Sequence, residues 1–133
     1  MSKNISTLPS IIQMTSCRRY PKVPDIRVRD YCCYYPYFMR VQDEHILRMV
    51  HRNGPAVVLM NSRNRDFINF RGDEYTGPCT TRYDHAVLLV GWDEQNYILQ
   101  NSWGSGWGQN GLFKLRRHVN KCGVQNLIAN ALL

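Results

Sequence analysis

No apolar run in the 133-residue sequence approaches the roughly 18 residues that a membrane-spanning helix requires, so we expect no membrane partner. The opening stretch, MSKNISTLPSIIQMTS, lacks a continuous apolar core of signal-peptide length, so the sequence predicts no export signal. No cysteine pair has C-x-x-C spacing, which leaves a thioredoxin-like site and a zinc ribbon without support. The sequence also has no internal repeat and no low-complexity segment. These absences leave an ordinary globular domain as the expected class.

Acidic residues are few relative to basic ones, with 10 Asp and Glu against 17 Lys and Arg, and the formal net charge is +7. Thirteen of the basic residues are arginines, which are scattered among acids instead of forming one block. Neither a zinc-finger spacing nor the aromatic signature of an RNA-binding module is present. We therefore interpret the charge as a solvated basic surface and expect no nucleic-acid partner.

The chain contains enough apolar material for one packed domain. Hydrophobic residues make up 44% of the sequence and aromatic residues 11%. A chain of this length buries roughly two thirds of its unfolded surface. Residues 1–40 hold four of the six prolines and no sustained hydrophobic period, so this part is predicted to be irregular and largely extended.

A helix is predicted over residues 43–53, DEHILRMVHRN, because its apolar residues fall near one face. Acidic residues begin the segment and basic residues end it, as the charge distribution of a helix favours. Gly54 and Pro55 follow directly and provide ordinary stop signals.

Strands are predicted after this helix. Residues 56–62 read as a β-branched strand, and residues 65–70 as a single helical turn. Three further strands are predicted over residues 85–92, 96–102 and 111–117. Because only short turns separate these three strands, they are expected to form an antiparallel meander.

Five cysteines are many for a chain of this length: Cys17, Cys32, Cys33, Cys79 and Cys122. Cys79, His85, His118 and Cys122 could together supply two sulfur and two nitrogen ligands to zinc. Their C-x5-H and H-x3-C spacings match no common structural zinc module, and we expect neither a metal nor another cofactor. Disulfides are the simpler explanation, although an odd count leaves one thiol unpaired.

Polar residues at the ends of two predicted strands indicate catalysis. His85 begins one strand, and Asn101 lies 16 residues later at the end of the next. Adjacent antiparallel strands bring such positions together, so the two residues are predicted neighbours. A catalytic imidazole needs a partner that fixes its tautomer, and an asparagine carbonyl does so without adding charge. A chance polar pair at a sheet edge is the alternative, but it leaves the adjacent Trp103 unexplained.

Trp103 has a chemical use beside such a pair. An indole can exclude water from the hydrogen bond and strengthen it by lowering the local dielectric constant. A neutral asparagine suits a thiolate–imidazolium pair, in which the negative charge already lies on sulfur. The loop NSWGSGWGQNG is therefore interpreted as an orienting amide under an aromatic cover.

The stretches DHAVLLVGW, NYILQNSWGSGWGQNG and CGV resemble the C-terminal half of papain-family cysteine proteases, the cathepsin group. The resemblance is specific from about Gly54 to Gly123. A weaker stretch, SCRRYPKVPDIRVRDYCCYYPY, resembles the group 1 mite allergen branch of that family. The resemblance implies an α+β fold with an antiparallel, barrel-like sheet, formed by residues 16–133. Residues 1–15 remain unassigned.

The same resemblance implies residue roles and a setting. His85 would be the catalytic histidine, Asn101 its orienting partner and Trp103 the shield. The pocket for the substrate side chain would be bordered by Leu59, Tyr83, Ala86 and Leu127. Cys79 and Cys122 would form a disulfide. Peptides or proteins would be the substrates, and the family implies a secreted or lysosomal location.

The sequence departs from this family at the nucleophile. The family's cysteine stands in a C-G-[SA]-C-[WY] motif about 130 residues before the histidine. Only 84 residues precede His85, and neither that motif nor the oxyanion glutamine before it occurs. The helical nucleophile domain is therefore expected to be missing. Cys17, and Cys32 or Cys33, would lose their disulfide partners with it.

Two functions remain open from the sequence. The chain is either the incomplete half of a thiol peptidase or a non-catalytic papain-like protein that binds peptides or proteins. In the first case the missing helical domain would be its partner. Either reading predicts that the chain alone does not cleave peptide bonds, because no described motif supplies an activated thiol.

Overall fold

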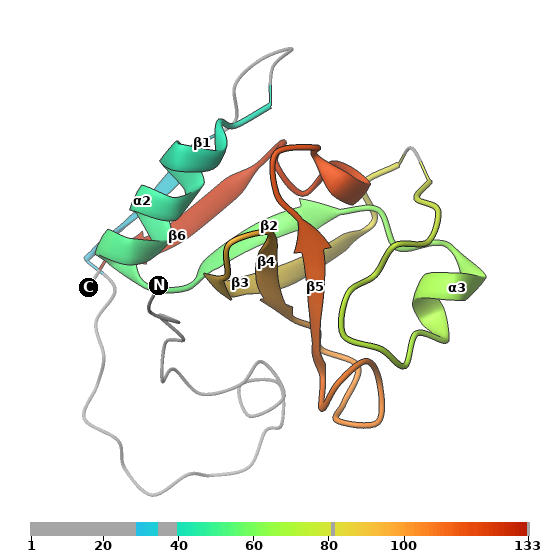
Figure 1. Ribbon diagram of the computed structural model, residues 1–133. Coiled ribbons are helices and arrows are strands. Elements are labelled where there is room, and N and C mark those ends of the chain that lie inside the picture. The colour runs from blue at the N-terminus through green and yellow to red at the C-terminus, as the bar shows by residue number, and fades with distance from the viewer. Residues whose placement is uncertain (1–28, 35–39, 81, 133) are drawn as a thin grey trace, which may run out of the picture.

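The computed structural model describes residues 29–34, 40–80 and 82–132. Residue 16, the expected start of the domain, and Cys17 lie outside these ranges. In chain order the elements are β1 Asp30–Tyr34, α2 Asp43–Asn53, β2 Ala56–Met60, α3 Arg65–Ile68, β3 His85–Trp92, β4 Asn96–Gln100, β5 Leu112–Arg116, η1 Lys121–Gly123 and β6 Ile128–Leu132 (Figure 1). Within the described ranges, no helix has the length and apolar character needed to span a bilayer.

Helix α2 has the bounds that its sequence predicts. Ile46, Met49 and Val50 are buried, and their spacing places them on one face of the helix. Gly54 ends the helix with a φ of 84°, and its N–H donates to the Val50 carbonyl over 3.0 Å. The apolar face packs on β2, β3 and β6, so α2 covers one side of the sheet.

Strands β3, β4 and β5 form the predicted antiparallel meander. β3 spans the predicted residues, β5 is one residue shorter at each end, and β4 stops two residues early, at Gln100. The Asn101 side-chain oxygen accepts the backbone N–H of Ser102 over 2.8 Å. This local bond offers the backbone an alternative to the sheet ladder, which explains why β4 ends there.

The prediction of irregular chain over residues 1–40 is wrong for residues 30–34, which form β1. β1 pairs antiparallel with β6, from Asp30 opposite Leu132 to Tyr34 opposite Ile128. The sequence did not predict β6 either. The two strands lie near opposite ends of the described chain, so their pairing depends on tertiary context that no local pattern records.

The six strands form one antiparallel sheet in the order β1-β6-β2-β3-β4-β5. The sheet is not closed, because β1 and β5 remain as edges, and it is barrel-like only loosely (Figure 1). A segment before β3 runs beside β5: the Lys114 N–H donates to the Asp73 carbonyl over 2.8 Å, and the Tyr75 N–H to the Lys114 carbonyl over 3.0 Å. These bonds protect part of the β5 edge from pairing with another chain.

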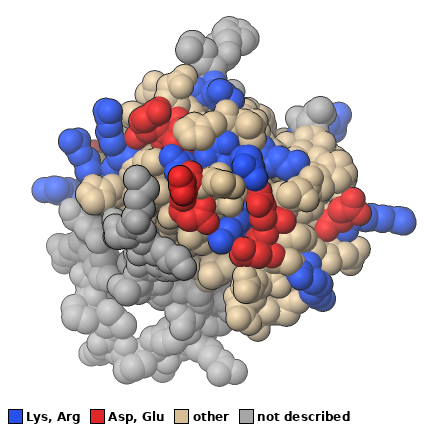
Figure 2. Space-filling view, in the orientation of Figure 1, with Lys and Arg blue, Asp and Glu red and all other residues tan. Residues whose placement is uncertain are grey.

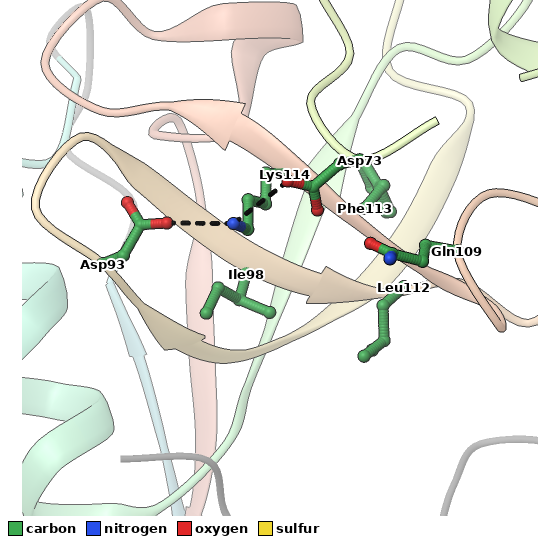
Figure 3. Close-up of a pocket in the computed structure, with 7 residues that line it drawn as sticks. All are labelled: Asp73, Asp93, Ile98, Gln109, Leu112, Phe113 and Lys114. Atoms are coloured by element: carbon green, nitrogen blue, oxygen red, sulfur yellow. Dashed lines mark ion pairs between the residues drawn. The ribbon is translucent and has the colours of Figure 1, made fainter. Parts of the chain in front are cut away.

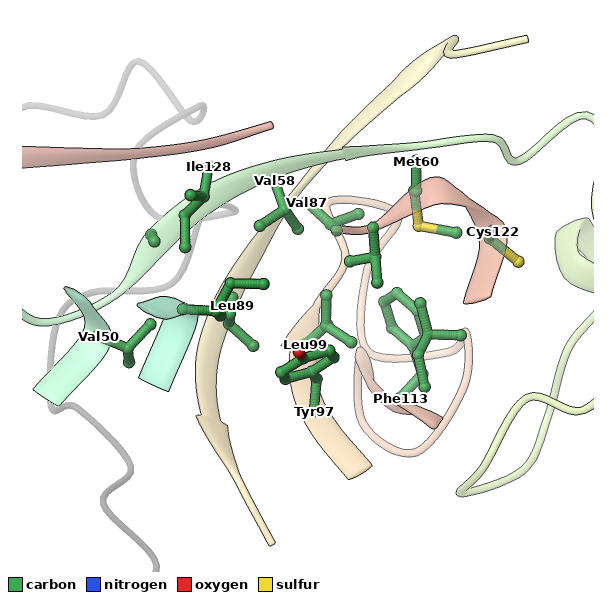
Figure 4. Close-up of a cluster of buried hydrophobic side chains, with 14 of the residues drawn as sticks. Val50, Val58, Met60, Val87, Leu89, Tyr97, Leu99, Phe113, Cys122 and Ile128 are labelled. Carbon is green, nitrogen blue, oxygen red and sulfur yellow. The ribbon is translucent and has the colours of Figure 1, made fainter. Parts of the chain in front are cut away.

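The core lies between α2 and the inner face of the sheet. Figure 4 shows side chains from α2, from strands β2 to β6 and from η1 pointing toward one another. Buried residues alternate along β2, where Val58 and Met60 are buried, and along the first part of β3, where Val87 and Leu89 are buried. Each side chain of this size stabilises the fold by about 1.5–3 kcal/mol when fully buried. The residues between them on β2 and β3 face the opposite side.

Cys79 and Cys122 form the predicted disulfide, with an S–S distance of 2.05 Å and Cα atoms 5.1 Å apart. Because both sulfurs are consumed in this bond, the four-ligand zinc site is excluded. Cys32 and Cys33 on β1 are free thiols, the first half-buried and the second exposed. The distant disulfide partner expected for one of them stays a prediction.

A buried ion pair ties the start of α2 to the end of β5. Arg117 Nη2 lies 2.8 Å from Asp43 Oδ2, and the Tyr97 hydroxyl donates to Asp43 Oδ1 over 2.5 Å. Burial would raise the pKa of Asp43, but the hydrogen bonds from Arg117 and Tyr97 outweigh it and hold that pKa below its usual value. Burial and the bond to Asp43 raise the pKa of Tyr97, so its hydroxyl remains a donor.

Candidate active site

The first residue of β3, His85, stands at the end of the sheet opposite Met60, the last residue of β2. Because side chains alternate along a strand, His85 lies on the same face as Val87 and Leu89, which are buried. His85 itself is half-buried. Its ring therefore stands at the rim of the core, supported by the protein and still accessible.

His85 and Asn101 form the predicted hydrogen bond, with 2.8 Å between His85 Nε2 and Asn101 Oδ1. The same oxygen accepts the backbone N–H of Ser102, which identifies it as the carbonyl oxygen of the amide. Nε2 must then carry the proton and donate, which leaves the lone pair on Nδ1. Asn101 is fully buried, so this bond is held away from bulk water. In the neutral form of the ring, Nδ1 is then the nitrogen that can accept a proton.

Trp103 covers this pair. Its ring stacks on His85 with centroids 4.8 Å apart and an interplanar angle of 29°. Phe67 and Trp107 hold the indole from the other side, each with an edge contact at 5.6 Å. The face of an aromatic ring also attracts a cation, so Trp103 would stabilise the imidazolium that proton transfer creates.

The loop from Asn101 to Gly111 bends sharply beneath Trp103. The Asn101 N–H donates to the Gly111 carbonyl over 2.9 Å, and the Gly111 N–H donates to the Trp107 carbonyl over 2.9 Å. Gly108 has a φ of 59°, and a Cβ there would lie 2.6 Å from the Leu112 carbonyl oxygen. Only glycine fits this approach, which explains why a glycine directly follows Trp107.

A segment around α3 fastens the loop from outside. Trp107 Nε1–H donates to the Phe67 carbonyl over 2.8 Å, and the Gly108 N–H donates to the Phe70 carbonyl over 2.9 Å. The Arg71 guanidinium donates to the Gly106 carbonyl. The sequence did not single out Phe67, although its place among closely spaced aromatic residues is a signal that could have found it.

Asp84 is a further residue that sequence reasoning missed. Its Oδ1 accepts the backbone N–H of Ser62 over 2.8 Å and the Ser62 hydroxyl over 2.9 Å. The Asp84 N–H donates to the Met60 carbonyl over 3.3 Å. These bonds join the end of β2 to the start of β3 and so fix the backbone that carries His85. The position of Asp84 directly before His85 is the sequence signal that could have identified it.

The four residues expected to border the substrate pocket do not all lie on one element or in one row. Leu59 and Ala86 are cross-strand partners on the outward face of β2 and β3. One further step of the β2–β6 register would place Leu127 opposite Leu59. Tyr83 is exposed and lies against Gly123, where an added Cβ would come within 2.5 Å of its ring. Three of the four residues therefore fall in one row across the sheet, beside the end where His85 stands.

Known proteins match this chain in sequence and in fold. The sequence profile of the papain family cysteine proteases matches residues 12–132. The chain belongs to that family. The matched range includes His85, Asn101 and Trp103. Family membership also accounts for the antiparallel sheet with few helices.

Individual papain-family relatives resemble the chain closely. The viral cathepsin of Spodoptera litura multicapsid nucleopolyhedrovirus is 36% identical over 118 residues, which cover 86% of this chain and 33% of the relative. The cysteine protease CMS1MS2 of Carica candamarcensis, solved with E-64, superposes with a TM-score of 0.73 at 28% identity, covering 84% of this chain and 52% of that one. A structure from work on the mite allergens Blo t 1 and Der p 1 gives 0.71 at 30% identity, covering 87% and 40%. The chain thus spans about a third to a half of these proteins.

Replacing Trp103 with alanine is expected to open the papain-family histidine to water. Exchange of the His85 Nε2 proton should accelerate roughly three- to tenfold, because a stacked aromatic pair contributes about 0.5–1.5 kcal/mol. The carbon-bound ring protons of His85 should also lose the shielding of the indole ring current. Both effects are measured by NMR on histidine-labelled chain. Trp103→Phe keeps an aromatic face, so it should retain most of the protection from exchange and most of the ring-current shielding. Unchanged exchange in Trp103→Ala would contradict the shielding role.

Proposed function

We propose that residues 16–133 form the histidine–asparagine half of a cysteine peptidase, which hydrolyses peptide bonds with a thiolate supplied from outside this chain. The observation that carries the proposal is the 2.8 Å bond from His85 to Asn101 beneath the Trp103 ring. Membership of the papain family and the free lone pair on His85 Nδ1 support it. A hydrogen bond that fixes a tautomer in this way is what a catalytic base requires.

The reaction follows from this geometry. His85 Nδ1 takes the proton of the incoming thiol, and the thiolate attacks the carbonyl carbon of the peptide bond. The imidazolium then gives the proton to the departing amine, which leaves an acyl-thioester that water hydrolyses with His85 again as base. Asn101 Oδ1 accepts the Nε2–H in both charge states of the ring, so the ring keeps its orientation throughout. Because Asn101 is neutral, the thiolate remains the negative partner of the imidazolium.

The cysteines within the described chain do not supply this thiolate. Cys79 and Cys122 are joined to each other. Cys32 and Cys33 lie on β1, which is separated from β3 by β6 and β2. Three strand spacings of roughly 4.8 Å put β1 about 14 Å from β3, too far for a thiol to reach His85. None of the cysteines in the described ranges is placed to act on His85, so we propose that the nucleophile comes from a partner unit.

The outward face of β2 and β3 is where this unit would pack. Val57 is 43% exposed, and Leu59, Ala86 and Leu88 share its side of the sheet. No described element covers this face, since α2 packs on the opposite one. Relatives that are two to three times longer have the additional chain needed to cover it. We propose the helical, cysteine-bearing half of such a protein as its occupant.

The substrate side chain would lie at the end of the same face. Leu59, Ala86 and Leu127 would form an apolar floor, and Tyr83 would stand at its border. Apolar pockets with few polar groups favour apolar ligand side chains. A hydrophobic residue next to the scissile bond is therefore the preferred substrate of this proposal.

Complementation tests the proposal. The refolded chain would be mixed with a separately expressed helical half of a papain-family relative that carries the C-G-[SA]-C-[WY] motif. We expect hydrolysis of a broad fluorogenic dipeptide by the mixture only, together with labelling of one cysteine by E-64. The helical half alone and the chain alone are the controls. Association without turnover or labelling would overturn the peptidase proposal.

A non-catalytic binding protein is the second candidate, favoured by the absence of the nucleophile motif from the 133 residues. It predicts saturable binding of an apolar peptide to the chain alone, with no cleavage after complementation. Isothermal titration with a non-hydrolysable peptide, repeated on Leu59→Glu, separates the two functions. Loss of peptide binding in that variant, combined with absent turnover in the mixture, would favour the binding protein.

A further inference from the structure

A hollow of about 340 Å³ lies at the C-terminal end of α2, lined by Arg29, Arg52, Asn53, Ala131 and Leu132. Its walls come from three parts of the chain: the residue before β1, the last turn of α2 and the end of β6. The residues of the candidate active site take no part in it. Among its described lining residues, the charged ones are the two arginines, and none is an acid.

The arginines of this hollow are unpaired within the described ranges. No described carboxylate lies within 4.0 Å of the side-chain nitrogens of Arg29 or Arg52, nor of Arg48 one helical turn before Arg52. Figure 2 shows basic side chains projecting from the left of the molecule, the side on which α2 lies in Figure 1. Arg48 and Arg52 are neighbours of like charge on one helix face, which is unfavourable until an anion joins them.

A second hollow contains a basic residue that is paired with carboxylates. It measures about 210 Å³ and lies over β4 and β5. There, Lys114 Nζ lies 3.2 Å from Asp73 Oδ2 and 3.2 Å from Asp93 Oδ2, as Figure 3 shows. Hydrogen bonds to these two carboxylates raise the pKa of Lys114. Among the residues that the structure describes, acids thus surround Lys114 and none pairs with the arginines of the first hollow.

Among the described residues, the acids nearest in sequence form no ion pair with Arg29 or Arg52. Asp30 follows Arg29 directly, but its Oδ1 accepts the backbone N–H of Tyr31 over 2.8 Å. Successive side chains on an extended strand point to opposite faces, which separates the Asp30 carboxylate from the Arg29 guanidinium. Glu44 stands two turns before Arg52 on α2 and forms no ion pair with a described residue.

Hydrogen bonds hold the walls of the hollow together. The Arg29 N–H donates to the Leu132 carbonyl over 2.8 Å. The buried Asn130 Nδ2 donates to the carbonyls of Gly54 and Pro55, each over 3.1 Å, and so joins β6 to the end of α2. The backbone segments that carry Arg29 and Arg52 are therefore held in place before any ligand binds, which lowers the conformational entropy lost on binding.

We propose that this hollow binds a tetrahedral oxyanion, the sulfate or phosphate group of a free ion or of a sulfated polysaccharide. Arginine is suited to the task, because its planar fork donates two parallel hydrogen bonds to such a group and keeps its charge at every physiological pH. The guanidinium groups of Arg29, before β1, and Arg52, in the last turn of α2, would hold one oxyanion together. Arg48 would extend the contact to a neighbouring group on a polymer.

The test is an NMR titration of the full chain at constant ionic strength with three probes: sodium sulfate, sodium phosphate and a heparin-derived hexasaccharide. Saturable shifts of the Asn53 and Ala131 backbone amides are expected. Arg29→Gln and Arg52→Gln should each weaken the binding about tenfold, as for a charge-assisted bidentate contact. Arg52→Lys should fall between Arg52→Gln and the parent chain.

Arg65→Gln is the matched control, because it removes the same charge from an exposed position on α3. It should leave the affinity of all three probes unchanged, and circular dichroism confirms that each variant folds. A hexasaccharide that binds at least about a hundredfold more tightly than the ions identifies a polysaccharide site, as multivalency requires. Equal affinities for the hexasaccharide and for the ions identify a site for the free ion. The proposal is overturned if no probe saturates, or if Arg65→Gln weakens binding as much as Arg52→Gln.

Discussion

Replacing His85 with alanine is expected to lower kcat/KM of the complemented peptidase by on the order of a million-fold, as removal of the general base does in a serine peptidase. The loss is this large because the variant can neither deprotonate the thiol nor protonate the departing amine. No other described histidine contacts Asn101. Initial rates on a fluorogenic dipeptide at acidic and neutral pH measure the effect.

His45→Ala is the control for this experiment. His45 is an exposed histidine on α2 whose ring contacts that of Tyr34 at a tilt of 40°. Its replacement should leave the turnover of the mixture unchanged. The uncomplemented chain should show no turnover with or without His85. If the chain alone cleaved the substrate, lost that activity in His85→Ala and were labelled by E-64 on one cysteine, a thiol of this chain would be the nucleophile instead.

Replacing Arg117 with methionine is expected to lower the free energy of unfolding by about 3–5 kcal/mol, because it removes the guanidinium that contacts the buried Asp43 carboxylate. The more exposed His118, with Nε2 3.7 Å from Asp43 Oδ2, does not replace the two hydrogen bonds of that guanidinium. The Asp43 side chain is 3% exposed and that of Arg117 13%, so water does not replace the lost partner. Tyr97 would still donate to the carboxylate but cannot neutralise it. Urea unfolding followed by circular dichroism measures the loss.

The same ion pair predicts how stability depends on pH. Hydrogen bonds from Arg117 and Tyr97 hold the pKa of Asp43 below its usual value despite burial. The unfolded chain therefore binds this proton at a higher pH than the folded chain, with a carboxyl pKa of about 3.9. The contribution of Asp43 is full above that value and is lost as the pH falls through the folded pKa. Arg117→Met should flatten this acid limb of the stability curve.

Arg116→Met separates the buried pair from a surface pair. The neighbouring Arg116 is half exposed and lies 3.3 Å from Glu74. Its replacement should cost about 1 kcal/mol or less, as exposed ion pairs do. Equal losses of unfolding free energy in Arg117→Met and Arg116→Met would show that the buried Asp43–Arg117 contact stabilises the fold no more than a surface ion pair.

Much of the meander and its polar pair could be predicted from local pattern. Residues 43–53 and 85–92 have the predicted bounds, because a helical period and a β-branched run each fill one element completely. The His85–Asn101 contact was predictable for a related reason: a short turn joins β3 to β4, so sequence spacing alone places the two residues side by side. The identity of the pair as a catalytic unit then followed from chemistry and family resemblance.

Contacts between distant segments could not be predicted in the same way. Asp43, Tyr97 and Arg117 come from three separate elements, and each is an ordinary polar residue in its own neighbourhood. Phe67 likewise packs beneath Trp103 only because the α3 segment folds back on the loop. A local pattern records which face of an element is apolar, but it does not record which other element that face will meet.

The sequence by itself determined the helix α2, the three-stranded meander, the histidine–asparagine pair and the Cys79–Cys122 disulfide, because short turns or a family motif link the residues of each. Only the tertiary structure decided that β6 pairs with both β1 and β2, that the sheet remains open, and that Arg29 and Arg52 share one hollow. These features depend on which distant segments come to lie side by side. That outcome is set by the burial of the whole apolar surface at once, and no single stretch of the chain encodes it.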